Sequence, residues 1–79
     1  MKTFYINQKK NNHVNYYEIN GEIWSDLISY TTRVASYNHT SNEMSVYGWF
    51  SSTTAKHIND FLEYYGFEKC NKKQLENYQ

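Results

Sequence analysis

An Asn20-Gly21 pair stands between two runs of β-forming residues and constrains the fold of this chain more than any other feature. A two-residue type I′ turn needs a positive φ at both central positions, and Asn followed by Gly meets that need with the least strain. The pair therefore predicts a β-hairpin whose strands are residues 14–19 and 22–28. In this register the opposed pairs are Tyr17 with Trp24 and Val14 with Leu27.

Three further segments favour extended structure. Residues 3–7 alternate and predict a short strand with Phe4 and Ile6 on one face. Residues 27–37 are β-prone throughout and predict either one bent strand or two strands that separate near Thr31 and Thr32, with the second strand at 33–37. Residues 43–50 predict the last strand. Together these segments predict an antiparallel sheet of three to five strands.

One amphipathic helix is predicted over residues 53–65. Apolar side chains recur there at i, i+3, i+4 and i+7, which places them on one helix face; they are Ile58, Phe61, Leu62 and Tyr65. Ser52 or Thr53 is suited to cap the amino end. Gly66 is suited to the left-handed residue of a Schellman motif that Phe67 completes. The tail, residues 68–79, shows weak periodicity and predicts at most an added helical turn or a frayed end.

The fold class predicted is therefore α+β, with the small antiparallel sheet packed against one C-terminal helix in a single domain. One helix covers only one face of a sheet. The residues expected to face the helix are Val34, Met44, Val46 and Phe50. Those expected to face outward are Ala35, Tyr37, Tyr47 and Trp49, joined by Tyr30 and Tyr5.

The charge balance limits the function classes. Eight basic and eight acidic residues among 79 give a formal net charge of zero, whereas nucleic-acid-binding domains normally carry a basic excess. A chain without net charge self-associates more easily, so a homodimer is one expectation. No apolar run is long enough to span a membrane. The single cysteine, Cys70, excludes a disulfide framework, and the cytoplasm is the expected compartment.

An aromatic sheet face is the most informative surface that the pattern predicts. Aromatic residues are 19% of the chain, and nine are tyrosines. Such a face suits a partner protein, because Tyr and Trp are enriched at binding hot spots. Alternatively, this aromatic face is covered by a second copy of the chain, by the tail or by the first strand. Stacking of single-stranded nucleic acid also needs a positive groove, and only Arg33 and Lys2 are expected nearby, so this alternative is not favoured.

No catalytic, metal or cofactor motif emerges from the remaining polar residues. The three histidines lack the paired spacing of zinc ligands. On the predicted helix His57 would face Thr53 and Asp60, but a single helix face supplies neither cleft nor oxyanion hole, so a helix-surface hydrogen bond is expected instead. Lysines beside Cys70 favour a lowered thiol pKa, although a lone tail cysteine is usually incidental. We therefore predict a protein that is not an enzyme and holds no cofactor.

Two stretches carry a resemblance. Ser29–Tyr37 and Ser52–Leu62, followed by Tyr65 and Gly66, resemble short uncharacterised reading frames from phages and plasmids of low-GC Gram-positive bacteria, with the pattern "SY-T-VA", a strand, then "S-TT-KH-FL--YG". The resemblance covers about half of the chain. It implies a small phage protein that binds and inhibits a host or defence protein, as anti-CRISPR proteins do. Lys56 and His57, which the helix does not need for folding, are then expected partner contacts.

The function expected from the sequence is thus a small non-enzymatic binding protein in the cytoplasm of a bacterial host. Its alternatives are a nucleic-acid-binding regulator and a self-assembling structural protein. The residues expected to contact the partner are Tyr30, Arg33, Tyr37, Tyr47, Trp49, Lys56 and His57.

Overall fold

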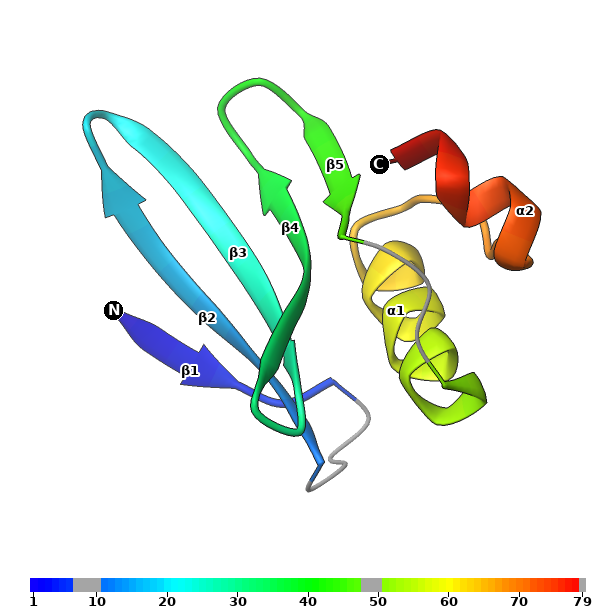
Figure 1. The fold of residues 1–79 in the computed structure, drawn as a ribbon. Coiled ribbons are helices and arrows are strands. Elements are labelled where there is room, and N and C mark those ends of the chain that lie inside the picture. The colour runs from blue at the N-terminus through cyan, green and yellow to red at the C-terminus, as the bar shows by residue number, and fades with distance from the viewer. Residues whose placement is uncertain (7–10, 48–50, 79) are drawn as a thin grey trace.

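The structure, a computed structural model, describes residues 1–6, 11–47 and 51–78, and it confirms the predicted α+β fold (Figure 1). Five antiparallel strands form one sheet in which spatial order follows sequence order. The strands are β1 (Lys2–Phe4), β2 (Asn12–Ile19), β3 (Glu22–Ser29), β4 (Thr32–Asn38) and β5 (Glu43–Val46). Helix α1 (Ser52–Tyr64) follows, and the tail forms α2 (Lys72–Leu75) and the short 3₁₀ helix η1 (Glu76–Tyr78).

The β2–β3 hairpin forms as predicted. Asn20 and Gly21 have φ values of 53° and 80°, both in the left-handed region that a type I′ turn requires. Tyr17 lies opposite Trp24, and Val14 lies opposite Leu27. Figure 1 shows the hairpin tip pointing away from α1, so the helix covers the opposite half of these two strands.

Residues 27–37 form two strands, which resolves the alternative left open by the sequence. The chain turns at Tyr30 and Thr31, and Ser29 pairs with Thr32 across the turn. Tyr30 has a φ of 57°, and its backbone N–H donates to the carbonyl of Asn11 at 2.6 Å. A bulky side chain in the left-handed region is strained, because its Cβ crowds the following carbonyl.

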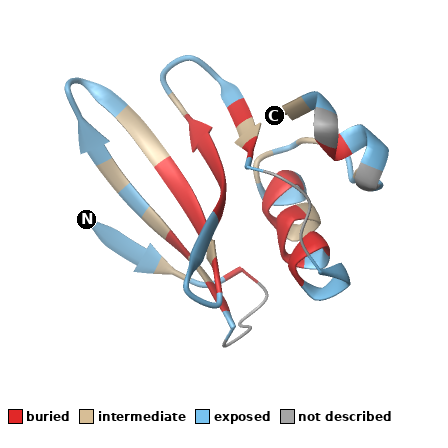
Figure 2. Ribbon diagram, viewed as in Figure 1, coloured by how far each residue is buried: buried red, intermediate tan, exposed pale blue. Residues whose placement is uncertain are grey.

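The core lies between the sheet and α1, as the burial colours of Figure 2 show along β3, β4 and the helix. Ile58, Phe61 and Leu62 are fully buried, which confirms the predicted apolar stripe. Leu75 of α2 is also buried in this cluster, so the tail adds a helical turn to the core. From the sheet, the cluster receives Val14, Leu27, Val34, Ala35, Tyr37, Met44 and Val46.

The prediction that Ala35 and Tyr37 face outward is wrong. A register shift places Leu27 opposite Ala35 and Ile28 opposite Arg33, which leaves Val34 as an extra residue in β4. Such a bulge shifts by one the alternation that follows it, because side chains alternate with a period of two. Val34, Ala35 and Tyr37 are therefore all buried against the helix. Trp49 and Phe50 lie outside the described residues, as does most of the predicted 43–50 strand beyond Tyr47.

The helix ends follow their predicted chemistry, with a shift of one residue at the amino end. Ser51 is the N-cap, and its side chain accepts from the Thr54 backbone N–H at 3.3 Å, whereas Ser52 or Thr53 was expected. At the other end Gly66 has a φ of 84°. The N–H of Phe67 donates to the Leu62 carbonyl at 2.9 Å and that of Gly66 to the Glu63 carbonyl at 3.0 Å, which is the hydrogen-bond pair of a Schellman motif.

Tyr30→Asn should raise the free energy of unfolding by about 0.5–1 kcal/mol, because Asn adopts the left-handed region with less strain. Asn20→Tyr is the matched reverse change, since Asn20 has nearly the same φ of 53°, and it should lower the free energy of unfolding by a similar amount. Urea denaturation of both variants measures the two shifts. Destabilisation by Tyr30→Asn would show that the Tyr30 side chain contributes more than its backbone strain costs.

Candidate interaction surface on the sheet

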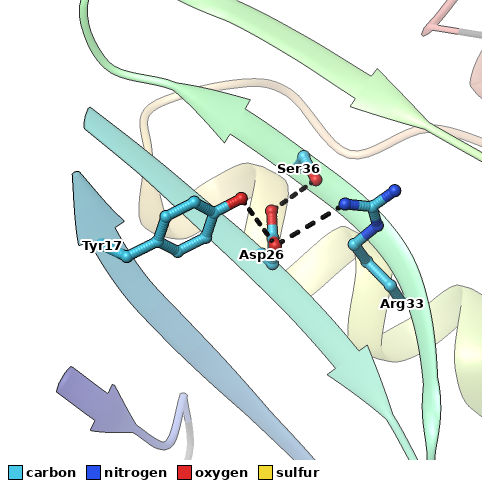
Figure 3. A network of polar contacts seen from close by, with 4 residues as sticks. All are labelled: Tyr17, Asp26, Arg33 and Ser36. Atoms are coloured by element: carbon cyan, nitrogen blue, oxygen red, sulfur yellow. Dashed lines mark hydrogen bonds and ion pairs between the residues drawn. The ribbon is translucent and has the colours of Figure 1, made fainter. Parts of the chain in front are cut away.

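The sheet face opposite α1 carries the features with the most potential for recognition, and we call it the open face. Strand register assigns its side chains, because directly paired residues project to the same side of a sheet. Those used below are His13, Tyr17, Glu22, Asp26, Arg33, Ser36, Asn38 and Glu43. Tyr5 and Tyr47 lie just beyond the ends of β1 and β5 and join this face through ring contacts with His13 and the Arg33 guanidinium. Figure 3 shows four residues of the open face with α1 behind the sheet.

A buried carboxylate organises the centre of this face. Asp26 is only 8% exposed. Its Oδ2 accepts a hydrogen bond from the Tyr17 hydroxyl at 2.9 Å, and its Oδ1 accepts one from Ser36 Oγ at 2.6 Å (Figure 3). Arg33 Nη1 lies 3.8 Å from Oδ2. A buried charge is tolerated when it is paired and hydrogen-bonded, so this network links three adjacent strands through β3.

The network raises the pKa of Tyr17. Burial is the largest cause, and the hydrogen bond to Asp26 and the negative charge of that carboxylate act in the same direction. The hydroxyl therefore remains a hydrogen-bond donor throughout the neutral range, because the phenol loses its proton only above its ordinary value of 10.0. This protonated state is the one that satisfies the Asp26 carboxylate.

Arg33 and Tyr47, two predicted contact residues, come together on the open face. The guanidinium carbon lies 5.0 Å from the centre of the Tyr47 ring, which is a cation–π distance. The Arg33 side chain is 56% exposed and Tyr47 is 46% exposed. Both groups are therefore held in place by neighbours while still accessible to a partner.

Charge is separated along the open face. Glu22 and Glu43 lie toward the β2–β3 hairpin end, where Asn38 Nδ2 donates to Glu22 Oε2 at 2.6 Å. Arg33 lies toward the opposite end, next to the β3–β4 turn. Acidic side chains thus outnumber the basic one on the described part of this face. A surface that tracks a phosphate backbone needs the reverse balance.

Tyr37 and His57 do not lie on a surface, contrary to prediction. Tyr37 is buried and stacks on Tyr65 with ring centres 4.8 Å apart. His57 is also buried, and its Nδ1 lies 3.0 Å from Ser29 Oγ. Ser29 Oγ is also 3.0 Å from Thr54 Oγ1. His57 points inward, where the Ser29 hydroxyl of β3 is its hydrogen-bond partner. No residue pattern within the helix indicates this contact.

The other predicted contacts are separate from the open face. Tyr30 is 54% exposed at the β3–β4 turn, with its ring centre 6.2 Å from that of His57. Lys56 is exposed and lines a groove of about 410 Å³ between α1 and residues 69–71. Trp49 lies outside the described residues.

Cys70 lines the same groove but has little nucleophilic character. Its Sγ lies 3.5 Å from the carbonyl oxygen of Glu68. Burial and then the charge of Glu68 raise the pKa of the thiol. The lowered thiol pKa that neighbouring lysines suggested is therefore wrong, because burial and a nearby carboxylate both disfavour the thiolate.

Sequence reasoning missed a second polar cluster, on the helix side of the sheet. Ser25 Oγ lies 2.7 Å from His39 Nε2 and 2.6 Å from the Tyr65 hydroxyl. A hydrogen-bonded Ser–His pair can act as nucleophile and base, but Ser25 is completely buried, so a substrate cannot reach its hydroxyl. The three residues are far apart in the sequence, and no local pattern connects them.

Metal and membrane features are absent from the part of the chain that the structure describes. There, no three His, Cys, Asp or Glu side chains group closely enough to hold a metal ion. Nor does any helix in the described ranges have the length and apolar character to cross a membrane.

Tyr17→Phe should lower the free energy of unfolding by about 1–2 kcal/mol, because it removes a hydrogen bond to a buried charge. In an Asp26→Asn background the same change should lower the free energy of unfolding by less, since the charged acceptor has already been removed. A double-mutant cycle by urea denaturation measures this coupling. Tyr5→Phe, at an exposed open-face phenol, is the control and should have little effect. Equal costs in both backgrounds would contradict the network.

The comparison with known proteins identifies a family without an assigned activity. A family model described as "Family of unknown function (DUF8033)" matches residues 1–77. No curated protein and no solved structure matches this chain. Because the match spans all but the last two residues, the chain belongs to the DUF8033 family.

Proposed function

We propose that this protein is a non-enzymatic binding module that contacts a partner protein through its open face. The observation that carries the proposal is the accessible Arg33–Tyr47 pair, anchored to the buried Asp26 network on a sheet face that α1 leaves uncovered. Tyr5, which is 57% exposed, adds a further aromatic contact to the same face.

Preorganisation makes this pair suited to recognition. Arg and Tyr are enriched at hot spots, because each buries a large contact area. The affinity of an interface is reduced when flexible side chains must be immobilised on binding. Arg33 is already positioned by Asp26 on one side and by the Tyr47 ring on the other. Less side-chain conformational entropy is therefore lost when a partner binds.

The charge pattern indicates the chemistry of the partner surface. A complementary protein would place a carboxylate near Arg33 and basic side chains near Glu22 and Glu43. Charges arranged in this way speed association and fix the docking orientation more than they add affinity. A protein surface fits this mixed pattern better than a nucleic acid, whose backbone carries only negative charge.

The resemblance to phage and plasmid reading frames supports a host or defence protein as the partner. In this proposal the protein acts in the bacterial cytoplasm, and it inhibits its target by occupying a surface that the target needs. The exposed Lys56, on the other side of the molecule, is available for a second contact.

Tyr47→Ala is the test of the open face, because it removes an exposed ring without emptying the core. Wild-type protein incubated with host lysate and then cross-linked to its bound partner should identify that partner. Titration of the purified partner then measures the dissociation constant. We expect Tyr47→Ala to weaken binding by about tenfold or more, as hot-spot truncations do. Tyr64→Ala is the matched control, since Tyr64 is also exposed, at 57%, but lies on α1.

Three outcomes would overturn the proposal. Equal affinity of wild type and Tyr47→Ala would exclude the open face as the contact. Salt-dependent binding of oligonucleotides, measured by fluorescence anisotropy, would favour the nucleic-acid alternative. A dimer in light scattering that Tyr47→Ala dissociates would show that the face serves a second copy of the chain.

A further inference from the structure

His39 connects several elements on the helix side of the sheet. It directly follows β4, and its backbone N–H donates to the Ile23 carbonyl at 2.8 Å. Its ring lies among three tyrosine rings, with centre distances of 5.4 Å to Tyr16, 4.7 Å to Tyr37 and 5.0 Å to Tyr65. These tyrosines belong to β2, β4 and the carboxyl end of α1, so one imidazole contacts three separate elements.

A hydrogen-bond chain runs through this cluster. The buried Ser25 Oγ is 2.7 Å from His39 Nε2 and 2.6 Å from the Tyr65 hydroxyl. A serine hydroxyl has one proton to donate. With a neutral imidazole, one consistent arrangement has Tyr65 donating to Ser25 and Ser25 donating to Nε2. Both contacts of Ser25 are then satisfied, and the chain ties α1 to β3.

Protonation of His39 reverses that chain. A charged imidazole carries a proton on Nε2 and must donate to Ser25. Ser25 then either accepts from both neighbours, which leaves its own proton without the imidazole acceptor, or donates to Tyr65, whose hydroxyl proton loses its acceptor in the chain. The positive charge is also placed among three tyrosine rings. Among the described residues, no carboxylate forms an ion pair with it.

Burial therefore disfavours the charged form. It lowers the pKa of His39 below the ordinary value of 6.5. The groups that face His39 are the hydroxyl of Ser25 in β3 and the phenol rings of Tyr16 in β2, Tyr37 in β4 and Tyr65, which directly follows α1.

We propose that His39 is a pH-sensitive latch that holds the carboxyl end of α1 and the β4–β5 turn against β3. The neutral ring closes the latch. Once protonated, the ring leaves the tyrosine cluster for water, and the Ser25–Tyr65 contact loses its partner. Local opening costs less than global unfolding, so the helix end loosens first while the open face, on the other side of the sheet, keeps its Asp26 network.

The direction of the pH effect follows from proton binding. With a folded-state pKa below 6.5, the unfolded chain binds more protons as the pH falls through 6.5. Stability from the latch is therefore complete above 6.5 and declines as the pH falls toward the folded-state pKa of His39.

The test is nuclear magnetic resonance of the full chain at a series of pH values. The imidazole resonances of wild-type His39 should titrate with a midpoint below 6.5, the ordinary value. Amide hydrogen exchange, corrected for its intrinsic pH dependence, should show lost protection at Gly66 and Phe67 over the same range. His39→Gln should remove this acid-dependent loss, and His13→Gln on the open face should retain it.

Two results would overturn the latch. A His39 midpoint at or above 6.5 would show that the folded state does not disfavour the charged ring, and this measurement needs no variant. An acid-dependent loss of protection that His39→Gln leaves unchanged would assign the opening to another group.

Discussion

The central strand β3 carries buried polar side chains on both faces, and the rest of the molecule is organised by how those groups are hydrogen-bonded. Leu27 lies in the core, between Ser25 and Ser29 on the same face. The two serines are hydrogen-bonded toward the two ends of α1, through Tyr65 on one side and through Thr54 and His57 on the other. Buried hydroxyls without partners are costly, so these bonds set where the helix lies on the sheet.

On the opposite face of β3 the buried polar group that needs hydrogen-bond partners is a carboxylate. Asp26 lacks a helix to cover it, and its neighbours on β2 and β4 satisfy it instead. A consequence is that Arg33 and Tyr47 are ordered on a face that stays accessible. The same electrostatic requirement that stabilises the sheet thus also orders the residues on which the proposed binding role rests.

The two faces respond to different influences. The open face depends on the contact between the Asp26 carboxylate and the Arg33 guanidinium. The helix side depends in part on the imidazole of His39, whose pKa is lowered below the ordinary value of 6.5 by burial. A molecule built in this way can change the docking of its helix end without disturbing its proposed contact surface.

The sequence by itself determined the elements that local chemistry controls. Asn20 and Gly21 specified the hairpin and its register, and Gly66 specified the helix end, because few residues tolerate a positive φ. The apolar spacing in α1 likewise determined which helix face is buried. Tyr47 was named as a candidate contact from the alternation of its predicted strand, and Arg33 from its expected position near the aromatic face.

Only the tertiary structure decided the orientation of β4 and the partners of the buried polar groups. The bulge at Val34 arises from pairing with β3, and it turned Tyr37 inward against the alternation read from the sequence. His57 is buried and His39 is half-buried, and each lies within hydrogen-bond distance of a serine on β3, at separations of 28 and 14 residues. Hydrogen bonds between such distant residues leave no periodic signal, since they depend on how the strands and the helix pack rather than on any local preference of the chain.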